Sequence, residues 1–361
     1  MGIVMENQAP PERTGTTLKK IKPENALKLK DVNKTSVLQE VARSFEKLIR
    51  FFGFSKEPEI KIDFARATDR GQRTYQQDET YAGLTDSGAI VGILADGMGG
   101  HVAGEVASML AKEAVLESLN PLLSKDIEPA DIHRALGDSV EAATKKLADH
   151  IKKNPQDDGM GTTLIVVVVF KEHLYWVSIG DSPLYLWRRN KCYQINQDHS
   201  MGPAIDQMAR AGLMTKEEAL AHPDRDALTS AVNGAKPDLI DAGNDAVPLQ
   251  LGDIVVLSSD GLQILPDKKI SRVLYLAQDR DPTYVAAALL NSVKRLDNPE
   301  QDNLSVVTIK VDEVPEENED KDGDDHAESE NTANGDASKS DAAKEDAPKD
   351  TFASDKQRKS S

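Results

Sequence analysis

Short apolar runs bounded by polar and turn residues recur along the middle of this chain and predict strands. They cover 62–68, 89–95, 163–170, 174–179, 184–188, 193–195, 254–258 and 305–311. Apolar residues at helical spacing predict helices just after His101 and over 130–152, 267–277 and 283–296. The polar stretch Lys171-Glu172-His173 predicts a tight turn between two strands. Strands and helices come in blocks rather than in strict alternation, which favours an α+β fold with antiparallel sheets.

Apolar residues that recur at helical spacing lie on one face of each predicted helix and are candidate core residues. After His101 the stripe is Val106, Met109, Leu110 and Ala114. Over 130–152 it is Ile132, Leu136, Val140, Ala143, Leu147 and Ile151. A polar insert over 202–235 contains Ile205, Met208, Ala209 and Leu213, whose spacing suits one short helix packed on the sheet.

Both ends of the chain are poor in apolar residues. Residues 312–361 hold 17 acidic and 7 basic residues, so they carry −10 of the net charge of −17. Such a segment cannot bury enough surface to fold alone. We therefore expect a disordered basic arm over 1–35, a disordered acidic tail over 312–361 and one folded domain over 58–311.

Residues 36–57 form a predicted amphipathic extension ahead of that domain. From Ser36, a candidate N-cap, to Gly53, a candidate stop, the apolar stripe is Leu38, Val41, Phe45, Leu48, Ile49 and Phe52. Two possibilities stay open for its apolar face. It packs on its own domain, or helix 36–54 docks a partner or a membrane surface.

Composition narrows the classes of protein. The chain has 361 residues, of which 39% are hydrophobic, and no segment approaches the roughly 20 apolar residues that cross a bilayer. Its first residues lack the charged-then-apolar layout of a secretory signal, so we expect a cytoplasmic protein. The net charge of −17 argues against nucleic acid as a main partner. The single cysteine, Cys192, excludes an intramolecular disulfide and a thiolate zinc site.

Five aspartates at the ends of predicted strands or polar stretches are the candidates for chemistry. They are Asp78, Asp96, Asp181, Asp260 and Asp302, and three glycines follow Asp96 within four residues. Each alone is commonly a turn or cap residue. Gathered at one sheet edge, they would repel one another unless cations lay between them. Hard oxygen ligands without Cys or clustered His select Mg²⁺ or Mn²⁺.

Six short blocks occur in an order that resembles one known family. They are Gly71-x-Arg73-x-x-Gln76-Gln77-Asp78, Ala95-Asp96-Gly97-Met98-Gly99-Gly100-His101, Gly161-Thr162-Thr163, Gly180-Asp181-Ser182, Ser259-Asp260-Gly261 and Asp302-Asn303. Together they resemble the metal-dependent protein phosphatases, the type 2C serine/threonine family, and Asp-Gly-Met-Gly-Gly-His is similar to its bacterial branch. The resemblance covers about 60–311. It implies a four-layer α-β-β-α sandwich, with two antiparallel sheets flanked by helices.

The resemblance also implies metal-binding roles. Asp96 would bridge two tightly held ions of Mn²⁺ or Mg²⁺, and the Gly97 carbonyl would bind one of them. Asp260 and Asp302 would hold the other ion. Asp78 would act mainly through metal-bound water.

A third ion and the substrate phosphate complete the site that the resemblance implies. Asp181 matches the position that helps to bind a weaker third ion in bacterial members. Arg73 would clamp the phosphate, since its planar fork meets two phosphate oxygens at once. The implied reaction is hydrolysis of phosphoserine or phosphothreonine in proteins by a metal-activated water held between two ions. The expected partners are phosphoprotein substrates of a serine/threonine kinase.

The chain departs from the family pattern at several positions. Met98 stands where animal members carry a His that is proposed to protonate the leaving oxygen; a metal-bound water or His101 could replace it. Gln77 stands where many relatives carry Glu. His199 is expected to orient its loop, and the insert over 202–234 corresponds to the variable flap beside the active site.

Two other classes of protein stay open. A pseudophosphatase would bind phosphoproteins without turning them over, although a binding module has no need for an anionic cluster. An interaction protein would act through its basic arm and acidic tail, with the domain as a scaffold.

Overall fold

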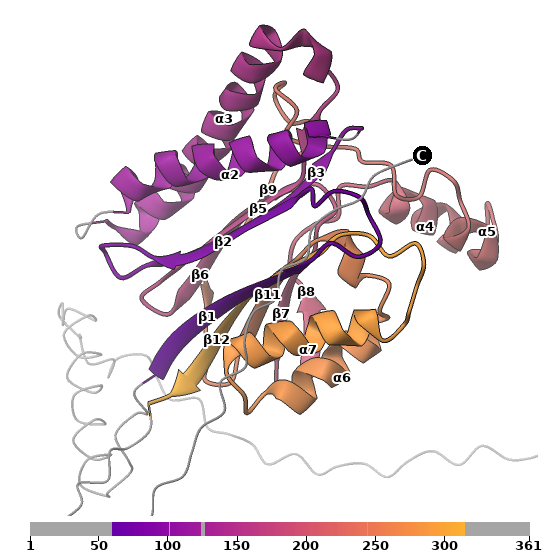
Figure 1. The fold of residues 1–361 in the computed structure, drawn as a ribbon. Coiled ribbons are helices and arrows are strands. Elements are labelled where there is room, and N and C mark those ends of the chain that lie inside the picture. The colour runs from indigo at the N-terminus through magenta and orange to yellow at the C-terminus, as the bar shows by residue number, and fades with distance from the viewer. Residues whose placement is uncertain (1–59, 101, 124–126, 244, 315–361) are drawn as a thin grey trace, which may run out of the picture. The chain divides into compact units, whose positions relative to one another are not determined.

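Two antiparallel sheets stacked face to face form the centre of the folded part of the chain in this computed structural model (Figure 1). The structure describes residues 60–100, 102–123, 127–243 and 245–314. The predicted arm over 1–35, the helix over 36–57, the tail beyond 314 and His101 lie outside the described residues.

The strand order places the two termini of the described region side by side in one sheet. The first sheet has the order β1 (Ile60–Asp69), β12 (Leu304–Glu313), β11 (Ile254–Ser258), β7 (Leu184–Arg188) and β8 (Lys191–Gln194). The second has the order β10 (Val247–Pro248), β6 (His173–Ile179), β5 (Leu164–Phe170), β3 (Ile90–Met98) and β2 (Asp78–Leu84). Two short strands join it: β4 (Gly161–Thr162) pairs with β3, and β9 (Asp241–Ala242) pairs with β6. The pairings between all these strands are antiparallel.

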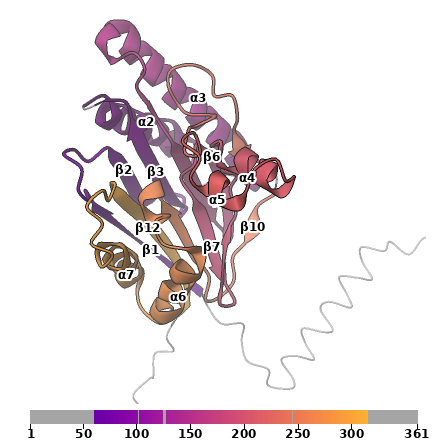
Figure 2. The ribbon, with the colours of Figure 1, turned by 90° about the vertical axis from the view of Figure 1, so that its right-hand side faces the viewer.

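Helices cover the outer face of each sheet (Figures 1 and 2). Helices α2 (Val102–Leu122) and α3 (Pro129–Lys153) pack on β3, β5 and β6, whereas α6 (Asp267–Ala277) and α7 (Pro282–Lys294) pack on β7, β11 and β12. A third apolar cluster lies between the sheets. Shorter helices, η2 (Pro155–Asp157), α4 (Gly202–Arg210), α5 (Lys216–Leu220) and η3 (Asp260–Leu262), lie in the connections. The predicted α-β-β-α sandwich is therefore confirmed.

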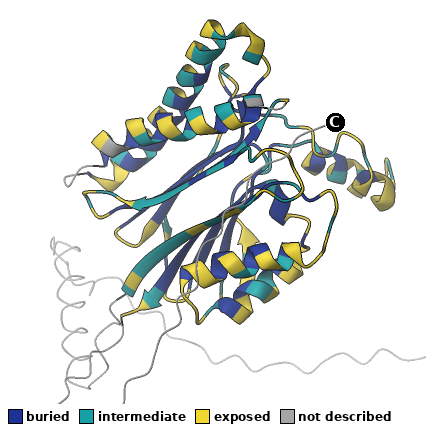
Figure 3. Cartoon of the chain, in the orientation of Figure 1, coloured by how far each residue is buried: buried dark blue, intermediate teal, exposed yellow. Residues whose placement is uncertain are grey.

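Burial explains most of the elements that the sequence predicted. Strand β5 is apolar and buried at every position, because helices cover one face of its sheet and the other sheet covers the opposite face (Figure 3). Lys171 and Glu172 link it to β6 with φ angles of 47° and 63°, the left-handed pair that a two-residue hairpin turn requires. The stripe of α3 is buried from Ile132 to Leu147, as predicted.

One strand was not predicted, and another is longer than predicted. The segment Asp78–Leu84 has no clear alternation, and its strand β2 was not predicted. It forms because each of its residues pairs with β3. Strand β3 was expected to stop at Ala95 but continues to Met98, since β4 pairs with Gly97 and Met98.

Two predictions about helix faces also need correction. The buried stripe of α2 contains Ala107, Ala111 and Val115, whereas Met109 is exposed. Within the flap, α4 ends at Arg210, and Leu213 lies beyond it, exposed to solvent. In the described residues, no helix combines the length and the apolar character needed to span a membrane.

Candidate metal centre

Strand ends bring the predicted carboxylates to one end of the sandwich. Asp78, the first residue of β2, lies directly opposite Asp96 on β3. Asp181 and Asp260 each lie two residues beyond a strand, β6 and β11, and Asp302 lies two residues before β12. A cavity of about 530 Å³ is lined by Asp96, Asp181, Asp260 and Asp302. Asp78 is buried next to them, close enough for its charge to act on Asp96.

Burial and mutual repulsion make these carboxylates hard to ionise. Burial, opposed by hydrogen bonds from Ser259 and Ser305 and reinforced by nearby Asp260 and Asp302, raises the pKa of Asp78 to about 7. Burial and then the neighbouring aspartates, Asp78 first, raise the pKa of Asp96 well above its ordinary value.

The two carboxyls beyond strand ends behave in the same way. Burial, with the charge of Asp260, raises the pKa of Asp181 to about 7. Burial, with the charge of Asp302, raises the pKa of Asp260 to about 6, against the opposing effect of Arg73. A cluster of buried carboxyl groups whose pKa values are raised by burial and by neighbouring like charges is typical of a functional site.

The donor set fits hard divalent cations. Asp78 Oδ2 accepts a hydrogen bond of 2.8 Å from the Ser259 hydroxyl, but Oδ1 is buried without a hydrogen-bond partner among the described residues. No three Asp, Glu, His or Cys side chains in the described ranges are arranged to hold an ion by themselves. A cation here would therefore take further oxygen ligands from water or from a backbone carbonyl, as Mg²⁺ commonly does.

The Gly161-Thr162-Thr163 block holds the backbone of Asp96. The Asp96 N–H donates to Thr163 Oγ1 at 3.0 Å, and the Asp96 carbonyl accepts from the Thr163 N–H at 2.8 Å and from Thr162 Oγ1 at 2.9 Å. Both threonines are buried. These hydrogen bonds, between residues more than 60 positions apart, give a structural reason for the occurrence of the Gly161-Thr162-Thr163 block together with Asp96.

Gly97 is required by a close backbone approach. A Cβ added there would lie 2.0 Å from the Gly104 carbonyl oxygen in the first turn of α2 and 2.7 Å from the Gln77 carbonyl oxygen. The Gly97 N–H donates to that Gln77 oxygen at 3.0 Å. Packing of β3, α2 and the segment before β2 thus excludes any side chain at the position next to Asp96.

Asn303 organises the loop that carries Arg73. Its buried side chain accepts a hydrogen bond from the Gln77 N–H at 2.8 Å and donates to the carbonyls of Arg70 at 2.8 Å and Tyr75 at 3.0 Å. One amide therefore ties both ends of the loop to the start of β12.

Arg73 reaches the carboxylates from this loop. Its Nη2 lies 2.5 Å from Asp302 Oδ2, and 57% of its side chain is exposed to solvent. The guanidinium lines the same cavity as the aspartates. It can therefore present donors to an anion at the mouth of the cavity.

The structure adds one carboxylate that the sequence analysis did not single out. Asp226, from the flap, lines the cavity, and its charge contributes to the raised pKa values of Asp181 and Asp260. It stands in the polar insert outside the motif blocks, so no sequence signal distinguished it from a surface residue. Asn303 and Ser259 did fall inside motif blocks, but their hydrogen bonds could not be read from the chain.

The structure also describes His199, Met98 and Cys192, three other residues considered from the sequence. The buried His199 accepts a hydrogen bond on Nδ1 from the Gly180 N–H at 3.2 Å, which fits the loop-orienting role predicted for it. Met98 lines the cavity, and its thioether has no proton to donate. Cys192 is half-buried, and burial raises its pKa to about 12, so it is a poor nucleophile.

Comparisons with known proteins agree with this arrangement. Residues 67–300 match the family model described as protein phosphatase 2C. The serine/threonine protein phosphatase PstP of Mycobacterium tuberculosis is 32% identical over 254 residues, which make up 70% of this chain and 45% of that protein. This chain thus spans less than half the length of that relative.

Solved structures resemble the fold as well. The serine/threonine phosphatase of S. agalactiae has a TM-score of 0.61 at 27% identity, covering 69% of this chain and 99% of that chain. The catalytic domain of PstP in complex with two manganese ions has a TM-score of 0.56 at 30% identity, covering 71% of this chain and all of that chain. The carboxylate cluster, the matched residues and these likenesses together show that this chain belongs to the bacterial branch of the protein phosphatase 2C family.

Proposed function

We propose that this protein hydrolyses phosphoserine and phosphothreonine in proteins with the help of Mn²⁺ or Mg²⁺. The observation that carries the proposal is the buried group Asp78, Asp96, Asp181 and Asp260, whose pKa values are raised by burial and mutual repulsion. Holding such charges together without cations destabilises a fold. Divalent ions would remove that cost and supply the chemistry of the family.

The chain offers a ligand for each expected ion. Asp96 and the Gly97 carbonyl would serve one ion, with Asp96 shared by the second, and Asp260 with Asp302 would hold that second ion. Asp181 would help to hold a weaker third ion, with Asp226 beside it. When bound, such ions lower the pKa of water and neutralise charge on the attacked phosphoryl group.

Two side chains would handle substrate and water. Arg73 would bind two phosphate oxygens with its planar fork, because it lies half-exposed at the cavity beside Asp302. Asp78 Oδ1 is buried without a hydrogen-bond partner in the described residues, so it would accept a hydrogen bond from water in the centre. Ser259 holds the other oxygen of that carboxyl in place.

The substrates would be phosphoproteins modified by a serine/threonine kinase. The likeness to PstP of M. tuberculosis and to the S. agalactiae serine/threonine phosphatase supports this substrate class. The opposing kinase and the cytoplasmic location stay predictions from the sequence.

An activity assay separates an active phosphatase from a pseudophosphatase. We predict Mn²⁺-dependent hydrolysis of p-nitrophenyl phosphate that is lost on chelation. In Asp96→Asn it should fall at least 100-fold, because that change removes the carboxylate charge that both ions would share. The metal-free Asp96→Asn protein should melt at the same or a higher temperature, since repulsion is relieved. Asp279→Asn changes an exposed aspartate in the turn between α6 and α7, so it is the matched control and should keep full activity. Full activity in Asp96→Asn would refute the metal assignment, and no turnover of the unaltered protein at saturating Mn²⁺ would favour the pseudophosphatase.

A further inference from the structure

At the end of the sandwich opposite the metal centre, several apolar side chains of the edge strands are only partly covered. Strand β2 starts at Asp78, in the metal centre, and reaches Leu84 six residues later, which is about 20 Å along a strand. At that far end Leu84 is 65% exposed. Figure 1 shows β1 and β2 as the edge strands of their two sheets on the same side of the sandwich.

The uncovered side chains belong to the face between the sheets. Ile62 and Phe64 on β1 lie opposite Val311 and Ile309, which are fully buried in the inter-sheet cluster. Directly opposite residues of an antiparallel pair point to the same face. Ile62 and Phe64 therefore face inward, yet they are only half-buried.

Leu84 faces the same way. Ala82 packs against the inter-sheet cluster, and Leu84 follows it by two residues, so both point to one face of β2. Nearer the metal centre, Arg66 of β1 donates a hydrogen bond of 2.8 Å to the Thr80 carbonyl and so joins the two edge strands. We call the group Ile60, Ile62, Phe64, Ala82 and Leu84 the open edge.

We propose that residues 36–57 cover the open edge with the apolar stripe of an amphipathic helix. The stripe Leu38, Val41, Phe45, Leu48, Ile49 and Phe52 needs a surface to pack on, and the open edge needs a cover. Residues 54–59 connect the helix to Ile60, the first residue of β1, and can span at most about 20 Å. The connection therefore holds the helix near the open edge. An 18-residue helix is about 27 Å long, which lies between the lengths of β2, about 23 Å, and β1, about 33 Å.

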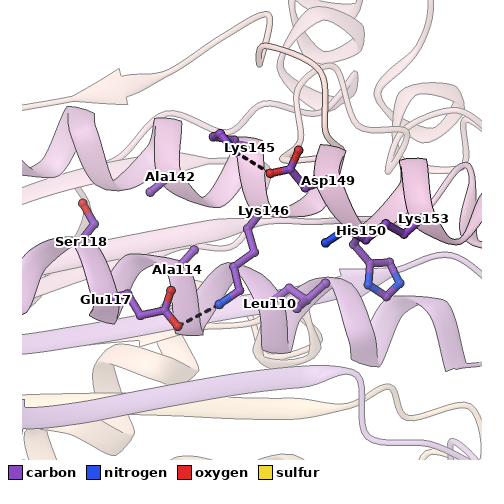
Figure 4. Close-up of a pocket in the computed structure, with 10 residues that line it drawn as sticks. All are labelled: Leu110, Ala114, Glu117, Ser118, Ala142, Lys145, Lys146, Asp149, His150 and Lys153. Carbon is purple, nitrogen blue, oxygen red and sulfur yellow. Dashed lines mark hydrogen bonds and ion pairs between the residues drawn. The ribbon is translucent and has the colours of Figure 1, made fainter.

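The groove between α2 and α3 is a poorer surface for this stripe (Figure 4). Charged side chains line much of it, and they are already paired: Lys145 with Asp149 at 2.5 Å and Lys146 with Glu117 at 2.9 Å. The groove between α6 and α7 combines exposed apolar side chains, Leu276 and Tyr284, with polar ones such as Asn291 and Arg295, and it is the rival surface to be tested.

Cysteine cross-linking in the full chain tests the proposal. Replacing the single cysteine with Cys192→Ser gives a clean background. Leu48→Cys is then combined with Leu84→Cys and treated with a short bifunctional maleimide. The matched controls combine Leu48→Cys with Leu276→Cys or with Leu220→Cys, two leucines that are 65% and 68% exposed.

We expect the intramolecular cross-link to Leu84→Cys to form at least tenfold faster than to either control position. Faster cross-linking to Leu276→Cys would place the helix in the rival groove. Equal rates at the three positions, no cross-link, or cross-links only between molecules would equally overturn the proposal.

Hydrogen exchange gives a second measurement without engineered cysteines. Phe45→Asp with Leu48→Asp, in the full chain, should speed exchange in peptides covering 60–66 and 79–85 and leave 273–295 unchanged. Faster exchange at 273–295 alone, or no change in any of the three, would contradict the proposal. Because neither test measures phosphatase activity, their outcome is independent of the proposed function.

Discussion

Hydrogen bonds from a few uncharged side chains hold the residues of the candidate metal centre in position. Thr162 and Thr163 hold the backbone of Asp96, and Ser259 holds one oxygen of Asp78. Asn303 holds the loop of Arg73. None of these is a charged group, so their importance comes from buried hydrogen bonds, which are costly to leave unmade.

Arg73→Ala should chiefly impair substrate binding. A charge-assisted hydrogen-bonded contact contributes about 1.5–3 kcal/mol, so kcat/KM for a phosphate ester should fall roughly 10- to 100-fold, mainly through a higher KM. The affinity for Mn²⁺, measured by calorimetry, should not fall, because Arg73 supplies no ligand. Arg70→Ala, in the same loop, is the control, and its kcat/KM and its affinity for Mn²⁺ should be close to those of the unaltered protein. Loss of Mn²⁺ affinity in Arg73→Ala would show that the arginine is structural.

Asn303→Ala should weaken both the fold and substrate binding. Three partly buried hydrogen bonds are lost with the amide, so the free energy of unfolding should fall by about 2 kcal/mol and the melting temperature by about 4–8 °C. KM should rise because the Arg73 loop is no longer anchored. Asn298→Ala, which removes a local bond from the Glu300 N–H, is the control. An unchanged KM in a destabilised Asn303→Ala protein would limit Asn303 to a structural role.

At the scale of elements, strand pairing and helix packing position the candidate site residues. Gly97, near the end of β3, must be a glycine because the carbonyl of Gly104 in α2 packs against it. Strand β2 lies next to β3, which sets Asp78 opposite Asp96. The flap, through Asp226, adds a carboxylate from a segment that belongs to neither sheet.

Deletion of residues 1–57 tests the role of the predicted helix. Hydrolysis of a small phosphate ester should stay nearly unchanged, because the extension supplies no ligand. If the helix covers the open edge, the melting temperature should fall by roughly 5 °C and self-association should increase, since half-buried apolar groups become exposed. An unchanged melting temperature would mean that the helix docks elsewhere, and loss of small-ester hydrolysis in a folded truncation would place it in the catalytic mechanism.

At the scale of the whole molecule, the carboxylate cluster couples folding to pH and to metal. Burial raises the folded-state pKa of Asp78 and of Asp181 to about 7, whereas an unfolded aspartate titrates near 4. Between these values the folded state holds more protons than the unfolded state. The stabilisation from these groups is therefore complete below about pH 4 and is lost as the pH rises towards 7.

In chelator, the melting temperature should accordingly fall by several degrees between pH 5.5 and pH 8. Saturating Mn²⁺ should raise it, and by more at pH 8, because cations bind the ionised carboxylates. Differential scanning calorimetry measures the change of melting temperature with pH, once in chelator and once with Mn²⁺. In chelator, Asp96→Asn should make the melting temperature depend less on pH. A melting temperature that rises with pH in chelator would show that the cluster does not control stability.

The sequence by itself was enough to predict most of the strands and helices and to single out five aspartates. The buried run of β5 and the stripe of α3 follow from periodicity, which is a local property set by burial on one or two faces. The order of strands and helices favoured an α+β fold with antiparallel sheets, and the four-layer sandwich was implied by the resemblance to the type 2C family. The five aspartates also stood out, since each adjoins a strand or a polar stretch and carries a hard oxygen ligand. Their metal-binding roles and that of Arg73 stay predictions.

Only the tertiary structure decided how these parts meet. Strand β2 has no pattern of its own and forms because β3 pairs with it. The bonds from Asn303 to the Arg73 loop cross more than 225 residues of sequence, and Asp226 joins the centre from the flap. The raised pKa values of the aspartates arise from desolvation and from neighbours far along the chain. Periodicity reports which face of an element is buried; the identity of the atoms on the other side is set by long-range packing and hydrogen bonding, which no local pattern contains.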